Sequence, residues 1–474
     1  MHLSFCGTVL NQTAQLFHRE PVTEDFRRFS TYASRVKTFN VEDWADAQLF
    51  SNYEIPFNVL VKLLQHGPQP LLPNLRSLRY PETHWYNHYE PGVAGRGPLY
   101  RSEPFFGSRL KEVTVKFGDW PSDEPRPTEV VRSLSYRSPS VESITMYQIG
   151  VFYPKHDLSR SARLVGPAIG ALIHLVKFES RMVFISPTAL LALGSLPKLQ
   201  ELVVHVDPTE YLWDALPHGT HSDHFPALKD LTLVKVPLEW CVAFMSDVVS
   251  SSSLWRVCLN YEDPDPTALP GMLLEAFCMS IANHPSSTTI REISFVIGWG
   301  EHTTPQVYRS PHISPLLSLP ALQKLSVHGG SCLVVVDDAF LDAITWSWPN
   351  LQSLEIHWPN SNRIGPGELG YPEATLAGVI LLARYCPRLT DLTFPIDTRD
   401  VPRLDKRRPP VPLWTSYASP LESFCPWGSA FQADDVHALA IQGYLISSFG
   451  TASTILEDTM AGEALDGCKQ AAFP

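Results

Sequence analysis

Closely spaced histidines are the first residues in this sequence that could bind a metal ion. His218, His221 and His224 lie three residues apart, and His84 and His88 lie four residues apart. A structural zinc site uses four tetrahedral ligands, and these commonly include cysteine thiolates. No cysteine lies near either group in the sequence. We therefore interpret these histidines as solvated loop residues, and we predict no metal site and no cofactor.

The usual sequence motifs of catalytic and nucleotide-binding sites are missing. Residues 329–333 (GGSCL) lack the final glycine of the G-x-S-x-G motif that positions a nucleophilic serine. There is no phosphate-binding P-loop, and no G-x-G-x-x-G follows an expected strand. We predict that the protein is not an enzyme and has no catalytic residues, although a triad assembled from distant residues would leave no such motif.

A recurring nine-residue pattern predicts the strands that would position any functional side chain. Each clear copy has apolar residues at offsets 0, +3 and +5, with a proline at offset −2. The last two apolar positions lie two residues apart, which is the period of a strand with one buried face. This is the leucine-rich-repeat core L-x-x-L-x-L, and it indicates a solenoid. The clear copies are 196–204 (LPKLQELVV), 225–233 (FPALKDLTL), 319–327 (LPALQKLSV), 348–356 (WPNLQSLEI) and 386–394 (CPRLTDLTF).

Weaker copies of the pattern extend over most of the chain. Eleven full copies in series would not arise by chance, even though 44% of the residues are apolar. The weaker copies are Val36/Phe39/Val41, Leu75/Leu78/Tyr80, Leu110/Val113/Val115, Val141/Ile144/Met146, Ile173/Val176/Phe178, Leu254/Val257/Leu259, Ile290/Ile293/Phe295 and the degraded Leu421/Phe424.

Helical patterns lie between many of these strands. The clearest cover residues 57–66, 186–196, 239–250, 271–283, 337–347 and 372–385, the last with Pro372 as its first helical residue. Repeated strand–crossover–strand units place parallel strands side by side. The prediction is an α/β leucine-rich-repeat solenoid, a curved horseshoe with parallel strands on its concave face and irregular helices and loops on its convex face.

The repeats also predict the domain organisation. Residues 1–34 form an N-terminal segment whose short helix begins at Thr23, and residues 35–432 form an irregular array of about 12 repeats. A C-terminal helix over residues 433–450 caps the array, because the open end of a solenoid core needs a polar cover. Residues 451–474 form a loosely ordered tail.

Composition limits the class of partner. A formal net charge of −12 argues against a nucleic-acid or anionic-membrane partner, since either would require a basic surface. No apolar run reaches the roughly 18–20 residues of a membrane-spanning helix. The eight cysteines include no C-x-x-C pair and fit reduced thiols. We expect an intracellular monomer, cytoplasmic or nuclear. The basic run 406–408 and the prolines after it could form a nuclear-import patch or a polyproline ligand, but short basic runs in loops are usually only solvated.

Strand geometry predicts which side chains could contact a partner. If offsets +3 and +5 point into the core, offsets +2, +4 and +6 face the concave surface. At offset +6, polar and aromatic residues would form a band of the kind that anchors a protein partner. Any exposed strand row also collects polar residues. The predicted partner-binding residues are Tyr147, His205, Asn260, His328 and His357.

The chain resembles the repeat region of fungal F-box/leucine-rich-repeat proteins. The resemblance rests on uneven repeat steps, on the C-P-x-L-x-x-L variant at Cys386, and on loop-rich insertions. Residues 21–26 (PVTEDF) and 32–37 (YASRVK) resemble the segment that joins the F-box to the first repeat, and residues 419–423 (SPLES) resemble the segment before the terminal helix. The similar region spans roughly residues 20–450.

This resemblance implies a horseshoe that holds a target protein for a cullin-type ubiquitin ligase. In that family the F-box binds the ligase adaptor. No segment here matches an F-box, so we expect adaptor binding only if an F-box lies upstream. We predict a non-catalytic protein-interaction module that resembles the substrate-recognition region of such a ligase subunit. The alternatives are a leucine-rich-repeat scaffold unrelated to ubiquitination and a GTPase-activating-type repeat protein, which would need a catalytic arginine that the sequence does not single out.

Overall fold

The structure is a computed structural model of the chain, and its described residues fall into two compact units divided after Leu228. The predicted helices at 57–66 and 433–450, the predicted tail and the histidines at 84, 88, 218 and 221 lie outside the described residues. The described residues are 23–40, 67–82, 102–117, 126–148, 163–164, 166–206, 224–261, 270–297, 306–329, 332–357, 372–397 and 423–425.

The first unit contains parallel strands that pair in sequence order. They are β1 (Thr38–Asn40), β2 (Ser77–Glu82), β3 (Glu112–Phe117), β4 (Ser143–Gln148), β6 (Lys177–Ile185) and β7 (Glu201–Val206), and the two-residue β5 (Arg163–Leu164) pairs with the end of β6. The helices are α2 (Thr23–Ala33), α5 (Arg126–Arg137) and α6 (Pro187–Gly194), with short 3-10 helices η1 (Glu103–Phe105) and η3 (Pro167–Ala171).

The second unit repeats this arrangement. Its parallel strands are β8 (Asp230–Val234), β9 (Arg256–Tyr261), β10 (Glu292–Ile297), β12 (Lys324–Gly329), β14 (Ser353–His357), β15 (Asp391–Thr393) and β16 (Ser423–Cys425). A separate parallel pair is formed by β11 (Gln306–Arg309) and β13 (Cys332–Val335). The helical segments are α7 (Leu238–Ala243), the π-helical turn η5 (Phe244–Val248), α8 (Pro270–Ala282), α9 (Ser310–Ile313), η6 (Ser314–Ser318), α10 (Asp338–Ser347) and α11 (Leu376–Tyr385).

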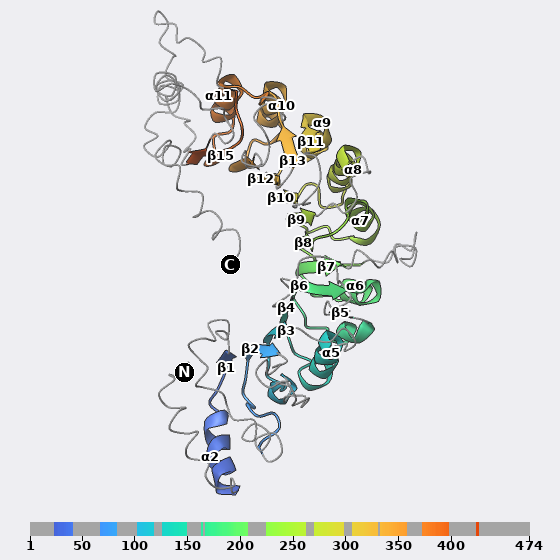
Figure 1. Cartoon of the computed structure of the whole chain (residues 1–474), viewed down its shortest axis with the longest axis vertical. Coiled ribbons are helices and arrows are strands. Elements are labelled where there is room, and N and C mark those ends of the chain that lie inside the picture. The colour runs from blue at the N-terminus through green and yellow to red at the C-terminus, as the bar shows by residue number, and fades with distance from the viewer. Residues whose placement is uncertain are drawn as a thin grey trace, which may run out of the picture. The chain divides into compact units, whose positions relative to one another are not determined.

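One face of the sheet is buried in each unit and the other is open. Burial alternates along β3, β8 and β9, so that every second side chain is inaccessible and its neighbours are partly exposed. Figure 1 shows α5 and α6 on one side of the strands of the first unit, and α7, α8, α10 and α11 on one side of the strands of the second. The buried positions are the predicted offsets +3 and +5, as at Ile293, Leu325 and Leu354, which pair across three neighbouring strands. The predicted α/β class and parallel strand pairing are confirmed.

One predicted repeat is wrong by two residues. Ile144 pairs with Phe178 rather than with Val176, and Leu175 is the buried residue at offset 0. Ile173, assigned to the core from the sequence, is 55% exposed. The true offset +5 is Ser180, which is buried and donates its hydroxyl to the carbonyl of Val183. A search for apolar residues cannot find a repeat whose last core position is a serine.

The start of α11 also differs from the prediction. The helix begins at Leu376, and Pro372 lies outside it. The side chain of Thr375 caps the helix by accepting from the backbone N–H of Ala377. The carboxylate of Asp338 accepts from both the N–H and the hydroxyl of Thr375, at 2.8 and 2.7 Å. Thr375 therefore defines the helix start, because it satisfies an N-terminal donor and is itself held by α10.

His284 joins two consecutive turns of the second unit. Its Nδ1 accepts from the backbone N–H of Ser286, so the neutral ring carries its proton on Nε2 and donates it to the carbonyl of Val249 at 2.9 Å. The ring is only 3% exposed, and burial lowers the pKa of His284 below its usual 6.5. Protonation of the neutral ring at Nδ1 would remove this acceptor and would place two N–H groups, those of His284 and Ser286, against each other.

This geometry predicts a pH-dependent contribution to stability. Because the pKa is lower in the folded than in the unfolded state, the contribution is fully present above pH about 6.5 and is lost as the pH falls below that value. Urea unfolding at pH 7.5, 6.5 and 5.5 should show the stability advantage of the native protein over His284→Asn shrinking with acidification. An advantage that stays constant over this range would contradict the assignment.

Candidate partner-binding face of the parallel sheet

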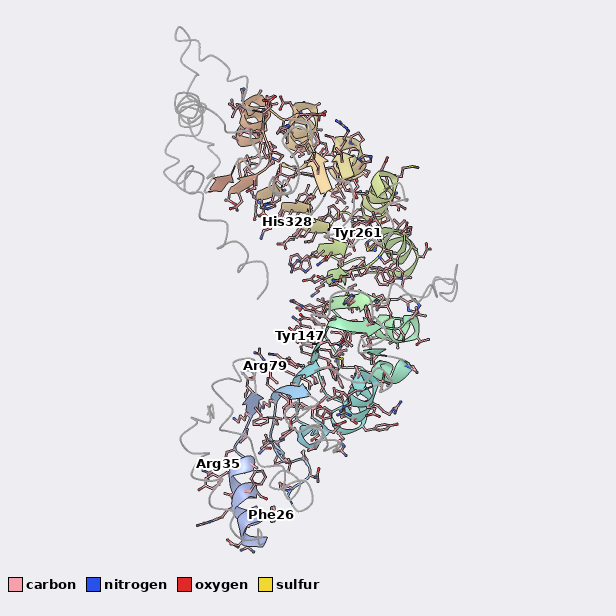
Figure 2. All side chains as sticks on the ribbon, viewed as in Figure 1. Phe26, Arg35, Arg79, Tyr147, Tyr261 and His328 are labelled. Atoms are coloured by element: carbon pink, nitrogen blue, oxygen red, sulfur yellow. The ribbon has the colours of Figure 1, made fainter. Side chains whose placement is uncertain are left out.

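The predicted partner-binding residues occupy the open face of the strands, with one exception. Tyr147 on β4, Asn260 on β9, His328 on β12 and His357 on β14 are all partly exposed. Figure 2 shows Tyr147 and His328 on the side of the strands that faces away from the helices. Tyr147 belongs to the first unit and the other three residues belong to the second.

His205 is the exception, because its side chain is only 3% exposed. Strand β6 contains a bulge between Glu179 and Phe184, and the register with β7 shifts there. The backbone N–H of Met182, in the left-handed region at a φ of 62°, donates to Nδ1 of His205 at 3.1 Å. The imidazole also contacts the Phe184 ring edge-on, with centroids 4.5 Å apart. The prediction of an accessible His205 is therefore wrong, because the extra residues of β6 cover it.

Around Tyr147 the open face of the first unit carries a network of paired charges. Glu179 accepts from Arg181 Nε at 2.6 Å and lies 3.6 Å from Lys177 Nζ. The Tyr147 hydroxyl lies 3.4 Å from the same carboxylate, and the guanidinium of Arg181 lies 5.8 Å from its ring centroid. Burial, followed by the charge of Glu179, raises the pKa of Tyr147 above 10, so the phenol stays protonated as a donor. Contacts with Glu179 and Arg181, which pair with each other, therefore hold the Tyr147 ring in place.

A ladder of alternating charges crosses the open face of the second unit. Arg256 lies between Asp230 and Glu292, at 3.2 and 3.7 Å, and Lys324 reaches Glu292 at 3.5 Å. These residues occupy offset +2 on four neighbouring strands, which the registers place side by side. Exposed pairs of this kind contribute little to stability, about 0–1 kcal/mol each. Their main effect is to make this row electrically neutral while leaving it polar.

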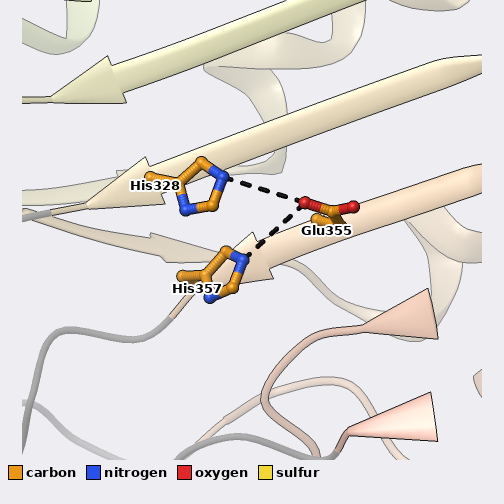
Figure 3. A group of neighbouring side chains, drawn as sticks. All are labelled: His328, Glu355 and His357. Atoms are coloured by element: carbon orange, nitrogen blue, oxygen red, sulfur yellow. Dashed lines mark ion pairs between the residues drawn. The ribbon is translucent and has the colours of Figure 1, made fainter. Parts of the chain in front are cut away.

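His328 and His357 are the two predicted residues that the fold brings together. They are paired in the register of β12 and β14, and their rings stack with centroids 4.0 Å apart at 18°. Glu355 lies two residues before His357 on the same face, and its Oε2 is 3.8 Å from His328 Nε2 and 3.9 Å from His357 Nε2. Figure 3 shows one nitrogen of each imidazole ring turned toward this oxygen. These three side chains form the histidine–glutamate cluster.

Two serines orient the carboxylate of the cluster. Ser353 donates to Oε1 of Glu355 at 3.0 Å, and Ser326 donates to Oε2 at 3.1 Å. Since the single hydroxyl proton of Ser326 goes to Glu355, the 2.7 Å contact between Ser326 Oγ and His328 Nε2 requires the ring to be the donor. Glu355 occupies offset +4, which predicts that it faces the open side, but its position between the two histidines has no signal in the sequence.

Neighbouring groups shift the pKa values of Glu355 and His328. His357, Ser353 and Ser326 lower the pKa of Glu355 to about 2, against the opposing effect of burial. At 3.9 Å, His357 Nε2 is beyond hydrogen-bond distance of Glu355, so its influence on the carboxylate is electrostatic. Burial and the neighbouring His357 lower the pKa of His328 to about 4, although Glu355 acts in the opposite direction. At neutral pH the carboxylate is therefore ionised and the His328 ring is neutral.

Asn260 lies apart from this cluster. It is on β9, and Val296 on β10 separates it from His328 at the same register position. The structure therefore divides the predicted band into three places, namely the Tyr147 network in one unit and Asn260 and the histidine–glutamate cluster in the other.

The chain matches no family model and no curated protein sequence. Among the helices that the structure describes, none combines the length and the apolar character needed to cross a membrane.

Proposed function

We propose that this chain is a non-catalytic leucine-rich-repeat protein that binds a protein partner on the open face of its parallel strands. The observation that supports this most is the one-sided burial of the sheet. Parallel sheets in most α/β proteins are covered by helices on both faces and consist of continuous apolar strands. Here buried apolar residues alternate with accessible residues that are mostly polar. An open parallel face is a preformed surface for a macromolecular partner.

The pairing of each strand with the strand of the next repeat supports the solenoid. Strand order follows sequence order within each unit, and the buried positions recur at the predicted offsets except in the repeat of β6, which is shifted by two residues. In a solenoid such strands line the concave side of a curved horseshoe, and helices and loops form the convex side.

The chemistry of the open face favours a protein over a charged polymer. The acidic and basic side chains at Asp230, Arg256, Glu292 and Lys324 neutralise one another, and the Tyr147 network does the same around Glu179. The rows formed by these described residues are paired rather than basic, which does not favour a nucleic acid. An aromatic ring fixed among satisfied polar groups is typical of the anchors at protein interfaces.

A pair of tyrosines provides a matched test of the binding face. Tyr147 lies on the open face, and Tyr136 is 80% exposed on helix α5 of the same unit. A photo-crosslinking phenylalanine analogue at position 147 should join the chain covalently to a partner in an extract of its own cells, and the same analogue at position 136 should not.

The second unit offers an equivalent pair. Val296 on β10 faces the open side, and Met279 on α8 is 45% exposed. The same partner should crosslink from position 296 but not from position 279. Equal crosslinking from strand and helix positions, or crosslinking from the helices alone, would contradict binding on the open face.

The resemblance to F-box/leucine-rich-repeat proteins supports a more specific role, in which the bound partner is a ubiquitination target. Binding of purified ligase adaptor is the direct test, using this chain beside a form extended by its upstream reading frame. Adaptor binding by either form would support a ligase subunit. Binding by neither form would contradict the ligase role. Partner binding on the open face is tested separately by the crosslinking experiment.

A further inference from the structure

We propose that His328, His357 and Glu355 form a binding site for a divalent transition-metal ion of the zinc type on the open face of the second unit. Among the residues that the structure describes, these three bring ligand atoms within 4.8 Å of one another. The site does not depend on the identity of a protein partner, because all three ligands come from β12 and β14 of this chain.

The spacing of the ligand atoms is close to that of a tetrahedral metal site. Metal–ligand bonds of about 2.0–2.2 Å place neighbouring tetrahedral ligands about 3.4 Å apart. Glu355 Oε2 lies 3.8 Å from one imidazole Nε2 and 3.9 Å from the other. These two separations therefore exceed the tetrahedral spacing by about half an ångström. The same separations are too long for hydrogen bonds, so the nitrogens converge on the carboxylate without forming direct hydrogen bonds to it.

The backbone holds the three ligands in place without help from loops. His328 and His357 are opposite each other in the ladder of β12 and β14, and Glu355 is two residues away on the same strand face. Ser353 donates to Oε1 of Glu355, which leaves Oε2 directed at the histidines. Outer partners that orient a ligating carboxylate in this way are common in metal sites and contribute to affinity.

The ligand types favour transition metals over calcium or magnesium. Two imidazoles and one carboxylate suit zinc, copper, iron or nickel, whereas calcium and magnesium prefer sites made wholly of oxygen ligands. Three protein ligands leave at least one coordination position for water. On binding, the His328 ring would shift its proton from Nε2 to Nδ1, and both rings would rotate about χ2, a torsion with a broad range in histidine. The parallel stack of the two rings would open.

Metal titration of the full-length protein tests the site. Chelator-treated protein would be titrated with Zn²⁺ in competition with a chromophoric chelator, and with Co²⁺ to record the d–d absorption of a four-coordinate site. Glu355→Gln keeps the size of the side chain, and His357→Ala removes one imidazole. Each should weaken binding of one equivalent of metal by more than the roughly 10- to 100-fold that loss of an outer partner costs. Ser353→Ala should fall within that 10- to 100-fold range.

His218 and His221 provide the matched control, because closely spaced histidines could bind metal independently of the cluster. The double variant His218→Asn/His221→Asn should keep the high-affinity equivalent and the Co²⁺ spectrum. Circular dichroism and urea unfolding of the metal-free Glu355→Gln variant would establish that it folds. Unchanged metal affinity in both folded cluster variants, or loss of the site only in the His218→Asn/His221→Asn variant, would overturn the proposal.

Discussion

Replacing Arg126 with alanine should lower the free energy of unfolding by about 3–5 kcal/mol, the usual cost of removing one partner from a buried ion pair. The Arg126 side chain is only 1% exposed, and its Nη1 and Nη2 bind the carboxylate of Glu103 at 2.5 and 2.7 Å. Glu129, one helical turn along α5, binds the same guanidinium at 3.0 Å. Without Arg126, the largely buried Glu103 carboxylate, 14% exposed, would lose the partner that compensates its charge.

Two further variants distinguish the charge effect from loss of packing. Arg132→Ala, at an exposed position on the same helix, should change stability by about 0.5 kcal/mol or less. The double variant Arg126→Met/Glu103→Leu should recover much of the loss, because a buried ion pair can be replaced by apolar groups of similar volume. Urea unfolding followed by circular dichroism measures all three. A double variant no more stable than Arg126→Ala would contradict an electrostatic origin.

Replacing Trp348 with alanine should lower the free energy of unfolding by about 3–5 kcal/mol or more. The indole is fully buried at the end of α10, and its Nε1 donates to the carbonyl of Leu316 in η6 at 3.2 Å. The substitution therefore creates a large cavity and also removes the donor to a buried carbonyl. The latter alone costs about 1–3 kcal/mol, which is the loss expected at minimum for Trp348→Phe.

Trp346 provides an internal control two residues away. Its side chain is 77% exposed and stacks on Tyr385 with ring centroids 6.2 Å apart. Trp346→Ala should change stability by about 0.5 kcal/mol or less. Unfolding followed by circular dichroism compares the two tryptophans without depending on their fluorescence. Similar losses at both positions would contradict the assignment of Trp348 as a core residue.

The sequence by itself predicts the buried face of most strands. Offsets +3 and +5 place Leu231, Val257 and Leu325 in the core, and all three are buried in paired strands. This part is predictable because burial in a strand follows a period of two, a local property of the chain. The helices from 338 and 376 could also be located, since their patterns lie between recognisable strands, although the first residue of α11 is fixed by the contact of Thr375 with Asp338.

The repeat pattern could not predict two local irregularities of β6. Ser180 occupies a core position because its hydroxyl finds a backbone partner, and apolar periodicity carries no record of that bond. His205 is buried because β6 bulges beside it, and the bulge arises from a backbone conformation at Met182 that no residue type signals. A glycine at that position would have been a clue, since glycine adopts positive φ freely.

The sequence likewise predicts one part of the histidine–glutamate cluster, and the tertiary structure decides the rest. Strand period alone determined that His328, Glu355 and His357 face the open side, because all three occupy even offsets. Offset +6 of two consecutive repeats predicts that His328 and His357, 29 residues apart in the chain, share one row, and the register of β12 with β14 places them directly opposite each other. Their convergence on one carboxylate oxygen then depends on the serine contacts to Glu355. Register and side-chain orientation are properties of the assembled sheet, so a single strand sequence cannot specify them.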